Sequence, residues 1–236
     1  MALLIDNDIV HKLAQLNLLK EAKLLLEKAY GELIVLNTLR FKYCHPTDSK
    51  KRKKAEKYYN SVVVLRIECF LNSGVTEISS VVVDSDLIIA MSLIDDLNGG
   101  EMQLLQALIN QKDQFLFTGD KRFLRGLVQA KNLEEKLNNV TEHFICFEQI
   151  IIYLIKCLTF EIINEKFIKA KDEQLPCFDS SLRVTFGSQR ELTEQSYVIE
   201  NLTREINILR KDTGNLLATA NIFYEYNSNV DLIIPY

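Results

Sequence analysis

The chain has 236 residues, of which 47% are hydrophobic, and its formal net charge is −4. This length and composition predict one globular domain with a substantial core, or one domain with an appendage. The negative net charge excludes a protein that is basic as a whole, so a nucleic acid would have to bind at a local basic patch.

Short apolar strands alternate with amphipathic helices along the first part of the chain. We predict strands at residues 3–5, 33–36, 75–84, 115–118 and 144–147. The spacing of apolar residues predicts helices at residues 9–30 (one helix or two), 38–43, 49–71, 86–97, 101–111, 121–130 and 149–158. This alternation is typical of an α/β fold and predicts a mostly parallel sheet of about five strands with helices on both faces.

The alternation stops near residue 158, which divides the chain into an α/β domain over residues 1–158 and a C-terminal region over residues 159–236. In the second region, residues 188–191 (Ser-Gln-Arg-Glu) match a capping box, the start of a helix that extends to about residue 211. We expect a helical appendage that covers the α/β domain, with partner binding or dimerisation as the alternative. Residues 231–236 could add an edge strand.

The cysteines and histidines favour a reducing compartment and argue against a structural zinc site. The five cysteines form no Cys-x-x-Cys pair, and the three histidines are isolated in the sequence. Asp6 and Asp8 interrupt the apolar N-terminus, so no signal peptide is expected. The most hydrophobic window, residues 144–163, contains three charged side chains, which is too many for a membrane span. We therefore expect a cytoplasmic protein without membrane contact.

Three carboxylates fall where a parallel sheet is expected to have its ligand crevice. Asp6 follows the first strand, Glu101 begins a helix after two glycines, and Asp120 follows the fourth strand. Carboxylates gathered without lysine or arginine repel one another, so such a cluster is stable mainly when Mg²⁺ or Mn²⁺ neutralises it. Two such cations about 4 Å apart would orient a water and a phosphodiester for in-line hydrolysis. The alternative makes Asp6 a loop residue and makes Glu101 and Asp120 helix caps.

Three segments are similar to the motifs of one known family. They are residues 4–8 (Leu-Ile-Asp-Asn-Asp), 99–105 (Gly-Gly-Glu-Met-Gln-Leu-Leu) and 117–124 (Phe-Thr-Gly-Asp-Lys-Arg-Phe-Leu). With these motifs, about residues 1–150 resemble the PIN-domain nucleases, and the C-terminal third is not covered. The resemblance implies a Rossmann-like three-layer sandwich and metal-dependent cleavage of RNA. It also implies a site in which Asp6, Glu101 and Asp120 are catalytic residues and ligands of Mg²⁺ or Mn²⁺, with Asp8 in support.

One acid of that family has no counterpart here. The family usually places another acid on the helix after the second strand, whereas residues 37–42 of this chain read Asn-Thr-Leu-Arg-Phe-Lys. Asp95 or Asp96 could replace this ligand from elsewhere, the site could hold one metal weakly, or activity could be reduced or absent. The alternative function is therefore a catalytically impaired PIN-like scaffold that binds RNA or a protein partner.

A second family shares part of the N-terminal pattern. Residues 6–10 (Asp-Asn-Asp-Ile-Val) look like the Asp-x-Asp-x-Thr/Val signature of haloacid-dehalogenase-type phosphatases. In those enzymes the first aspartate is the nucleophile and the second is a general acid. The last motif of that family is not matched, because no second aspartate follows Asp120 within a few residues. The phosphatase is therefore the less favoured alternative.

Basic and polar side chains supply candidate contacts to RNA phosphates. One group flanks Asp120, and the other belongs to the only strong charge block in the sequence, residues 50–57, which is followed by two tyrosines. The candidate substrate-binding residues are Thr118, Lys121, Arg122, Lys51, Arg52 and Lys54. The alternative for the charged members of both groups is a solvated helix surface.

The sequence thus favours a metal-dependent endoribonuclease that acts on RNA. A role as a toxin or defence-type nuclease is compatible with this prediction. Binding of an inhibitor or other partner protein, and assembly into a homo-oligomer, are also compatible with it.

Overall fold

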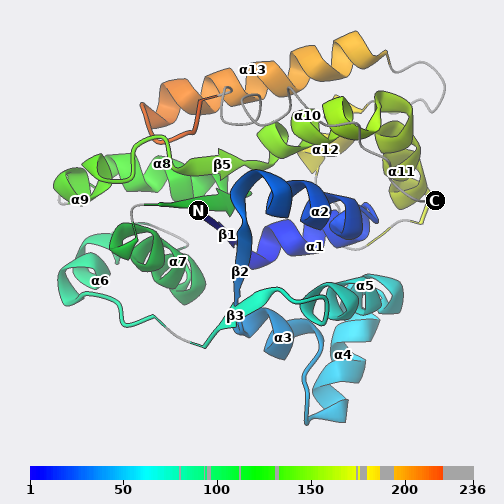
Figure 1. Cartoon of the computed structure of the whole chain (residues 1–236), viewed down its shortest axis with the longest axis horizontal. Helices are drawn as coiled ribbons and strands as arrows, with labels where there is room; N and C mark the ends of the chain where they lie inside the picture. Colours follow the sequence, from blue (N-terminus) through cyan, green and yellow to red (C-terminus); the bar gives the residue numbers. More distant parts are fainter. Residues whose placement is uncertain are drawn as a thin grey trace.

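The computed structural model describes residues 1–79, 81–92, 94, 97–111, 113–130, 133–173, 175, 180–186 and 194–219. At its centre lies a five-stranded sheet in the order β3-β2-β1-β4-β5 (Figure 1). The strands are β1 (Ala2–Ile5), β2 (Glu32–Leu36), β3 (Thr76–Ile78), β4 (Gln114–Thr118) and β5 (Phe144–Cys146). Every neighbouring pair is parallel, which confirms the predicted α/β fold.

Helices connect the strands and cover both faces of the sheet. Those before β4 are α1 (Asn7–Gln15), α2 (Leu19–Tyr30), α3 (Thr38–Tyr43), α4 (Ser49–Tyr59), α5 (Ser61–Leu71), α6 (Ser85–Met91) and α7 (Gly99–Asn110). Those after β4 are α8 (Lys121–Gln129), α9 (Glu134–Asn138), α10 (Phe147–Leu158), α11 (Phe160–Asp172), α12 (Ser180–Thr185) and α13 (Gln195–Thr213). Within the described part of the chain, none of them is both long and apolar enough to cross a membrane.

Three predicted elements differ clearly in extent from those observed, one being the helix expected over residues 86–97, which ends at Met91. The single helix expected over residues 49–71 is two helices, because Asn60 adopts a left-handed φ of 77° between them. Its side chain accepts a hydrogen bond from the N–H of Val62 at 2.8 Å and so caps α5. The strand expected over residues 75–84 ends at Ile78, and Asp84 instead caps α6.

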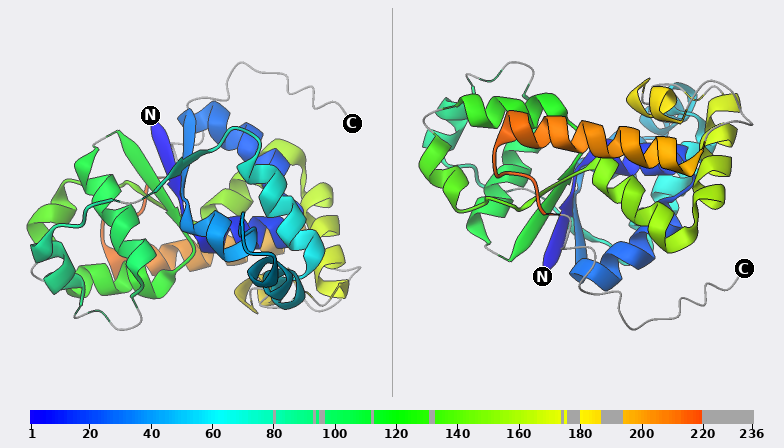
Figure 2. Two further views of the ribbon diagram at one scale, coloured as in Figure 1. Left: turned by 90° about the horizontal axis from the view of Figure 1, so that it is seen from below. Right: turned by 90° about the horizontal axis from the view of Figure 1, so that it is seen from above.

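The central strand β1 contributes to a hydrophobic core on each side of the sheet. Leu3 and Ile5 belong to one core, whereas Ala2 and Leu4 belong to the other. This division follows from the period of two along a strand, which directs successive side chains to opposite faces. Helices α1, α2, α5, α10 and α11 line the first core, and α6, α7 and α8 line the second (Figure 2).

The long helix α13 contributes to both cores. Val198 and Leu202 belong to the first core, and Ile206 and Leu209 belong to the second. The helix lies along α8 and α10, beside the β5 edge of the sheet (Figures 1 and 2). The C-terminal region thus packs against the α/β part of the same chain.

The chain after α13 returns to the sheet. Leu217 forms a parallel bridge with Phe144 of β5, so a segment of the C-terminal region runs along that edge. The predicted capping box at residues 188–191 and the predicted edge strand at residues 231–236 lie outside the described residues.

The strand order reverses between β1 and β4. From β1 the chain builds β2 and β3 on one side, and it then crosses to build β4 and β5 on the other. Ile5 is paired with Phe117 in the register, so Asp6, just after β1, lies beside Thr118, the last residue of β4. Open α/β sheets bind their ligands at such a switch point, outside the carboxyl ends of the strands.

Candidate functional site

A cavity of about 880 Å³ lies at the carboxyl ends of β1 and β4. Its walls come from the start of α1, from α3, from the N-terminus of α7 and from the turn between β4 and α8. The charged side chains that line it are Asp6, Asp8, Glu101, Asp120, Lys12, Lys42, Lys121 and Arg122. The three carboxylates that the sequence predicts as a cluster, together with the predicted supporting residue Asp8, thus face one cavity.

Asp6 occupies the N-cap position of α1, although its side chain makes no capping hydrogen bond. Its Oδ2 accepts a hydrogen bond of 3.2 Å from the hydroxyl of Thr118. Burial and the nearby Asp8 carboxylate raise the pKa of Asp6 to about 6, and the hydrogen bond from Thr118 offsets this rise only in part. A carboxyl group in this environment favours a bound proton or a neighbouring cation.

Glu101 is buried at the N-terminus of α7, where it forms a capping box with Asn98. The backbone N–H of Asn98 donates to Oε2 of Glu101 at 2.9 Å, and the N–H of Glu101 donates to Oδ1 of Asn98 at 3.2 Å. Burial, followed by the charges of Asp120 and Asp6, raises the pKa of Glu101 to about 7, against the opposing effect of the hydrogen bond from Asn98. Glu101 is therefore a helix cap, and it is also electrostatically coupled to the other two acids.

Asp120 is the N-cap of α8, which is the alternative to a metal ligand that the sequence indicates for this residue. Its Oδ1 accepts hydrogen bonds from the N–H groups of Arg122 at 2.8 Å and Phe123 at 3.0 Å. Its own N–H donates to Oγ1 of Thr118 at 3.2 Å. Thr118 is only 1% exposed and is not part of the cavity lining, so it positions Asp6 and Asp120 rather than contacting a substrate.

Asp8 is held in place by Lys12, one helical turn further along α1. The Lys12 Nζ lies 2.8 Å from Oδ2 of Asp8 and 5.5 Å from the centre of the Phe147 ring. This ion pair packs against Gly119, where an added Cβ would lie 2.8 Å from both Asp8 Oδ2 and Lys12 Nζ. A larger residue in the turn after β4 would therefore displace the pair. Sequence reasoning missed Lys12, although its spacing of four residues from Asp8 indicates an ion pair on a helix.

The wall formed by α3 carries no acid. Thr38 and Lys42, four residues apart on this helix, line the cavity there. As the sequence indicates, this helix has no carboxylate. The groups that it brings to the cavity are a hydroxyl and an ammonium group. Lys42 was also missed, and the same spacing of four residues would have placed it on the face of Thr38.

The two basic residues after Asp120 have different surroundings. Lys121 forms ion pairs with Glu148 at 2.6 Å and Glu205 at 3.1 Å, which tie α8 to α10 and α13. The expected contact of Lys121 with a phosphate is therefore opposed by two carboxylates that already hold it. Arg122 has a side chain that is 72% exposed, and its guanidinium lies 3.9 Å from Oδ2 of Asp120. Of the two, Arg122 has the position expected of a phosphate contact.

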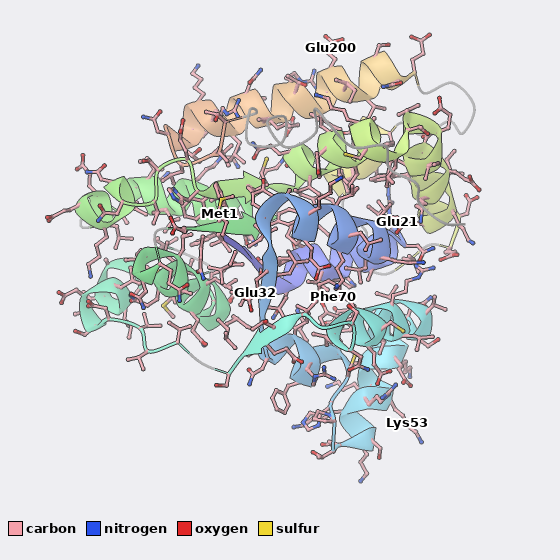
Figure 3. All side chains as sticks on the ribbon, viewed as in Figure 1. Met1, Glu21, Glu32, Lys53, Phe70 and Glu200 are labelled. Atoms are coloured by element: carbon pink, nitrogen blue, oxygen red, sulfur yellow. The ribbon has the colours of Figure 1, made fainter. Side chains whose placement is uncertain are left out.

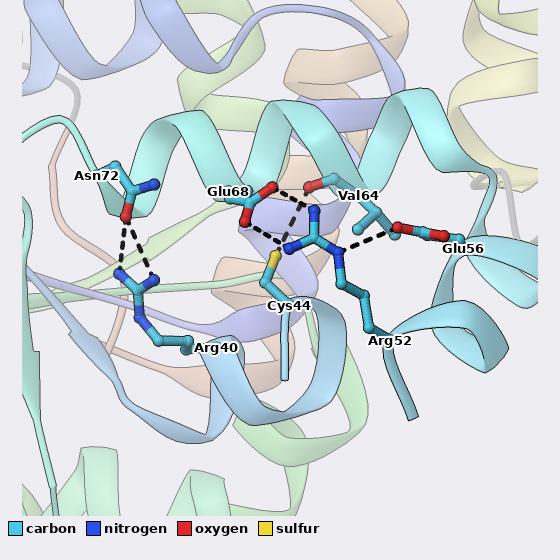
Figure 4. Close-up of polar contacts among 7 residues, drawn as sticks. All are labelled: Arg40, Cys44, Arg52, Glu56, Val64, Glu68 and Asn72. Atoms are coloured by element: carbon cyan, nitrogen blue, oxygen red, sulfur yellow. Dashed lines mark hydrogen bonds and ion pairs between the residues drawn. The ribbon is translucent and has the colours of Figure 1, made fainter. Parts of the chain in front are cut away.

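The predicted contacts from the charge block lie on α4 and are not part of the cavity lining. Arg52 binds both carboxylate oxygens of Glu68, at 2.8 and 2.6 Å, and its Nε donates to Glu56 at 3.1 Å (Figure 4). Arg52 thus joins α4 to α5, and a structural role replaces the expected RNA contact. Lys51 and Lys54 are exposed on the same helix.

The donor chemistry of the cavity fits Mg²⁺ or Mn²⁺, because both prefer carboxylate oxygens. Mutual repulsion contributes to the raised pKa values of Asp6 and Glu101, and a divalent cation would relieve it. Among the described residues, however, no three His, Cys, Asp or Glu side chains are grouped so as to hold a metal ion. The acids therefore face one cavity without a preformed coordination shell. Asp95 and Asp96, the expected replacements for the missing acid, lie outside the described residues.

The fold and the cavity define an open, doubly wound α/β protein with a crevice at its topological switch point, lined by four acidic and four basic side chains. Comparison with models of protein families, with curated proteins and with solved structures found no match to this chain.

Proposed function

We propose that this chain is a ribonuclease with a PIN-like domain that depends on Mg²⁺ or Mn²⁺. The observation that carries the proposal is the arrival of Asp6, Glu101 and Asp120 at one cavity from three segments that are far apart in the sequence. The raised pKa values of Asp6 and Glu101 in this crevice are typical of functional sites. Carboxylate oxygens at such a crevice suit a hard divalent cation.

Each acidic residue has a role in this proposal. Asp6, Glu101 and Asp120 would hold the cation, the last two while they continue to cap their helices. When bound, a divalent cation would polarise the phosphodiester and lower the pKa of the attacking water. Thr118 positions two of these acids through its hydroxyl group. Asp8, fixed by its ion pair, adds negative charge beside Asp6.

The phosphate groups of RNA would be bound by cations on two separate walls of the cavity. Lys42 extends from α3 and Arg122 from α8, and both side chains are exposed. Arginine binds phosphate through several N–H groups, whereas lysine acts as a point charge. A phosphodiester between them would lie at the mouth of the carboxylate cluster, where its hydrolysis is proposed.

A catalytically impaired scaffold that binds RNA or a protein is the second candidate. It is favoured by the α3 wall, where Thr38 and Lys42 line the cavity and no carboxylate is present. The absence of a preformed group of three ligands among the described residues also favours it. In this alternative, the lysines at the cavity would neutralise the acids that a metal ion neutralises in the enzyme.

Cleavage of a generic single-stranded RNA in the presence of Mn²⁺ separates these candidates. The wild type is compared with Asp120→Asn, because asparagine is as good an N-cap as aspartate and leaves α8 intact. The proposal predicts cleavage by the wild type and a loss of about a hundredfold or more in the variant. A wild type that neither cuts RNA nor binds Mn²⁺ would contradict the nuclease, and equal cleavage by both proteins would contradict the site. Hydrolysis of phosphomonoesters that is abolished by Asp6→Asn would instead indicate the phosphatase.

A further inference from the structure

A chain of aromatic contacts leads away from the cavity along α3 and α4. The Lys42 Nζ, at the cavity wall, lies 5.2 Å from the centre of the Tyr43 ring and 5.8 Å from that of Tyr59. The ring of Tyr59 in turn contacts that of Tyr58 edge to face, with 4.7 Å between their centres. Side-chain contacts thus connect Lys42, at the cavity wall, through Tyr59 to Tyr58 on the outer surface of α4.

Two aromatic side chains at this surface are exposed to solvent. Tyr58 is 58% exposed, and Phe41, the residue before Lys42, is 49% exposed. The Phe41 ring contacts His45 edge to face, with 5.4 Å between their centres. Exposed aromatic rings offer faces on which bases can stack, and rings beside cationic side chains are typical of sites that bind single-stranded nucleic acid.

The charge around these rings is strongly positive although the whole chain carries a net charge of −4. The exposed lysines of α4 are Lys50, Lys51, Lys53, Lys54 and Lys57. Figure 3 shows Lys53 on this helix, on the side away from the sheet. The one acidic residue of α4, Glu56, is paired with Arg52, and Lys51 lies 4.0 Å from the N-cap aspartate Asp48. Basic side chains still outnumber acidic ones on this helix. Such a local basic patch attracts a polyanion.

The surface is fixed to the body of the molecule before any ligand binds. Arg52 joins α4 to α5 through Glu68 at 2.6 Å, as Figure 4 shows. Beneath the surface, the rings of Tyr43 and Tyr59 lie 4.6 Å apart, and His11 stacks on Tyr43 at 5.6 Å. A preorganised aromatic surface loses little conformational entropy when a planar group stacks on it.

We infer that this α3–α4 surface, formed by Phe41, Tyr58 and the exposed lysines of α4, binds single-stranded nucleic acid. Bases stack on the exposed rings while the lysines contact the backbone phosphates, and Lys42 continues the path to the cavity. Stacking requires unpaired bases, because the faces of bases in a duplex are covered by their neighbours. The inference rests on the proposed function for the choice of RNA as the natural ligand, since the stacking chemistry accepts RNA and DNA alike.

Binding of a fluorescently labelled single-stranded oligonucleotide, measured by anisotropy in EDTA, tests the inference without cleavage. Tyr58→Ala and Phe41→Ala should each weaken binding by about fivefold to a hundredfold, and Tyr58→Phe should bind like the wild type. Tyr197→Ala is the matched control, because Tyr197 is 52% exposed on α13, away from this surface. Single-stranded RNA and DNA of one sequence should bind with similar affinity, and a blunt duplex should bind more weakly.

The dependence on salt separates the phosphate contacts from the stacking. The double variant Lys51→Ala/Lys54→Ala should lower the slope of log affinity against log salt by roughly 1.4, and the aromatic variants should leave this slope unchanged. Lys20→Ala/Lys28→Ala, on exposed positions of α2, is the control with the same loss of charge.

Several results would overturn the inference. Three results would each contradict it: unchanged affinity in both aromatic variants, tighter binding of duplex than of single strands, or no oligonucleotide binding. In the last case, an acidic protein would be the partner that fits this basic surface. Cleavage of RNA that does not depend on Tyr58 would overturn this surface but keep the proposed nuclease. Binding that depends on Tyr58, without cleavage in Mn²⁺, would confirm the surface and contradict the nuclease.

Discussion

The hydroxyl of Thr118 donates a hydrogen bond of 3.2 Å to Oδ2 of Asp6, although 112 positions separate the two residues in the chain. The same oxygen accepts a hydrogen bond of 3.2 Å from the N–H of Asp120. One buried hydroxyl therefore fixes the relative positions of two acids that follow adjacent strands. This arrangement makes the end of β4 the organising point of the cavity.

Thr118→Val removes this hydroxyl with little change in side-chain shape. We expect the free energy of unfolding to fall by about 1 kcal/mol, because the half-buried N–H of Asp120 and the carboxylate of Asp6 lose a hydrogen-bond partner. The pKa of Asp6 should rise further, because Thr118 no longer stabilises its charged form. Urea denaturation and NMR titration of Asp6 measure the two effects. Thr118→Ser keeps the hydroxyl and should largely restore both values, and a serine variant as perturbed as the valine variant would contradict this role.

Gly119→Ala tests the close contact between the turn after β4 and the Asp8–Lys12 ion pair. An added Cβ would lie 2.8 Å from Asp8 Oδ2 and from Lys12 Nζ, so the pair must move. Both atoms are the ends of flexible side chains, so we expect a cost of about 1 kcal/mol or less, the size of one weakened surface ion pair. Gly99→Ala is the matched control, because its added Cβ would meet no atom within 4 Å. Thermal denaturation should show a lower melting temperature for Gly119→Ala and no loss for Gly99→Ala. Equal stability of the two variants would contradict the contact.

The stability of the protein should depend on pH through Glu101. Its pKa rises from 4.5 to about 7 on folding, so the folded state binds more protons than the unfolded state between these values. The stabilisation from this group is complete below pH 4.5 and is lost as the pH rises through about 7. Glu101→Gln keeps the capping box. It should therefore raise the free energy of unfolding at about pH 8 by about 3 kcal/mol, with no gain near pH 4.5. A gain of the same size at both pH values would contradict the assignment.

Lys121 and Arg122 should differ in what they contribute. Lys121→Met leaves the buried Glu148 without its cation, so we expect a loss of stability on the order of 3 kcal/mol. Arg122→Ala, at a side chain that is 72% exposed, should change stability by less than about 0.5 kcal/mol. It should weaken RNA cleavage by about tenfold, because a charge-assisted contact to phosphate is lost. Calorimetry measures the stability of both variants, and an RNA-cleavage assay measures their rates. A large stability loss in Arg122→Ala together with unchanged stability in Lys121→Met would contradict these roles.

The strand pattern made the fold predictable from the sequence. The apolar runs of β1 and β4 read as buried strands because both faces of the sheet are covered, and their ends located Asp6 and Asp120 correctly. The break at Asn60 was missed because the helical pattern reads through it, although asparagine is a favoured N-cap and adopts a positive φ more often than most residues. The helical pattern around it is otherwise continuous.

The partners of the charged residues were less predictable than their positions. Glu205 of α13 contacts Lys121, from which it is separated by 84 positions in the sequence. The residues next to Lys121 in the sequence do not indicate this contact. The same holds for Arg52, whose partner Glu68 lies on the next helix. Ion pairs of this kind depend on how helices pack, and periodicity within one helix does not determine that packing.

The central claim is that the carboxylates at the ends of β1 and β4 bind a divalent cation, and a calorimetric titration with Mn²⁺ tests it most directly. At about pH 6.5, in buffers of different ionisation enthalpy, the account predicts saturable binding with release of protons, because Asp6 and Glu101 are partly protonated there. Binding should be lost in Asp6→Asn and Glu101→Gln. No Mn²⁺ binding to the wild type, or binding of equal strength in both variants, would contradict the account.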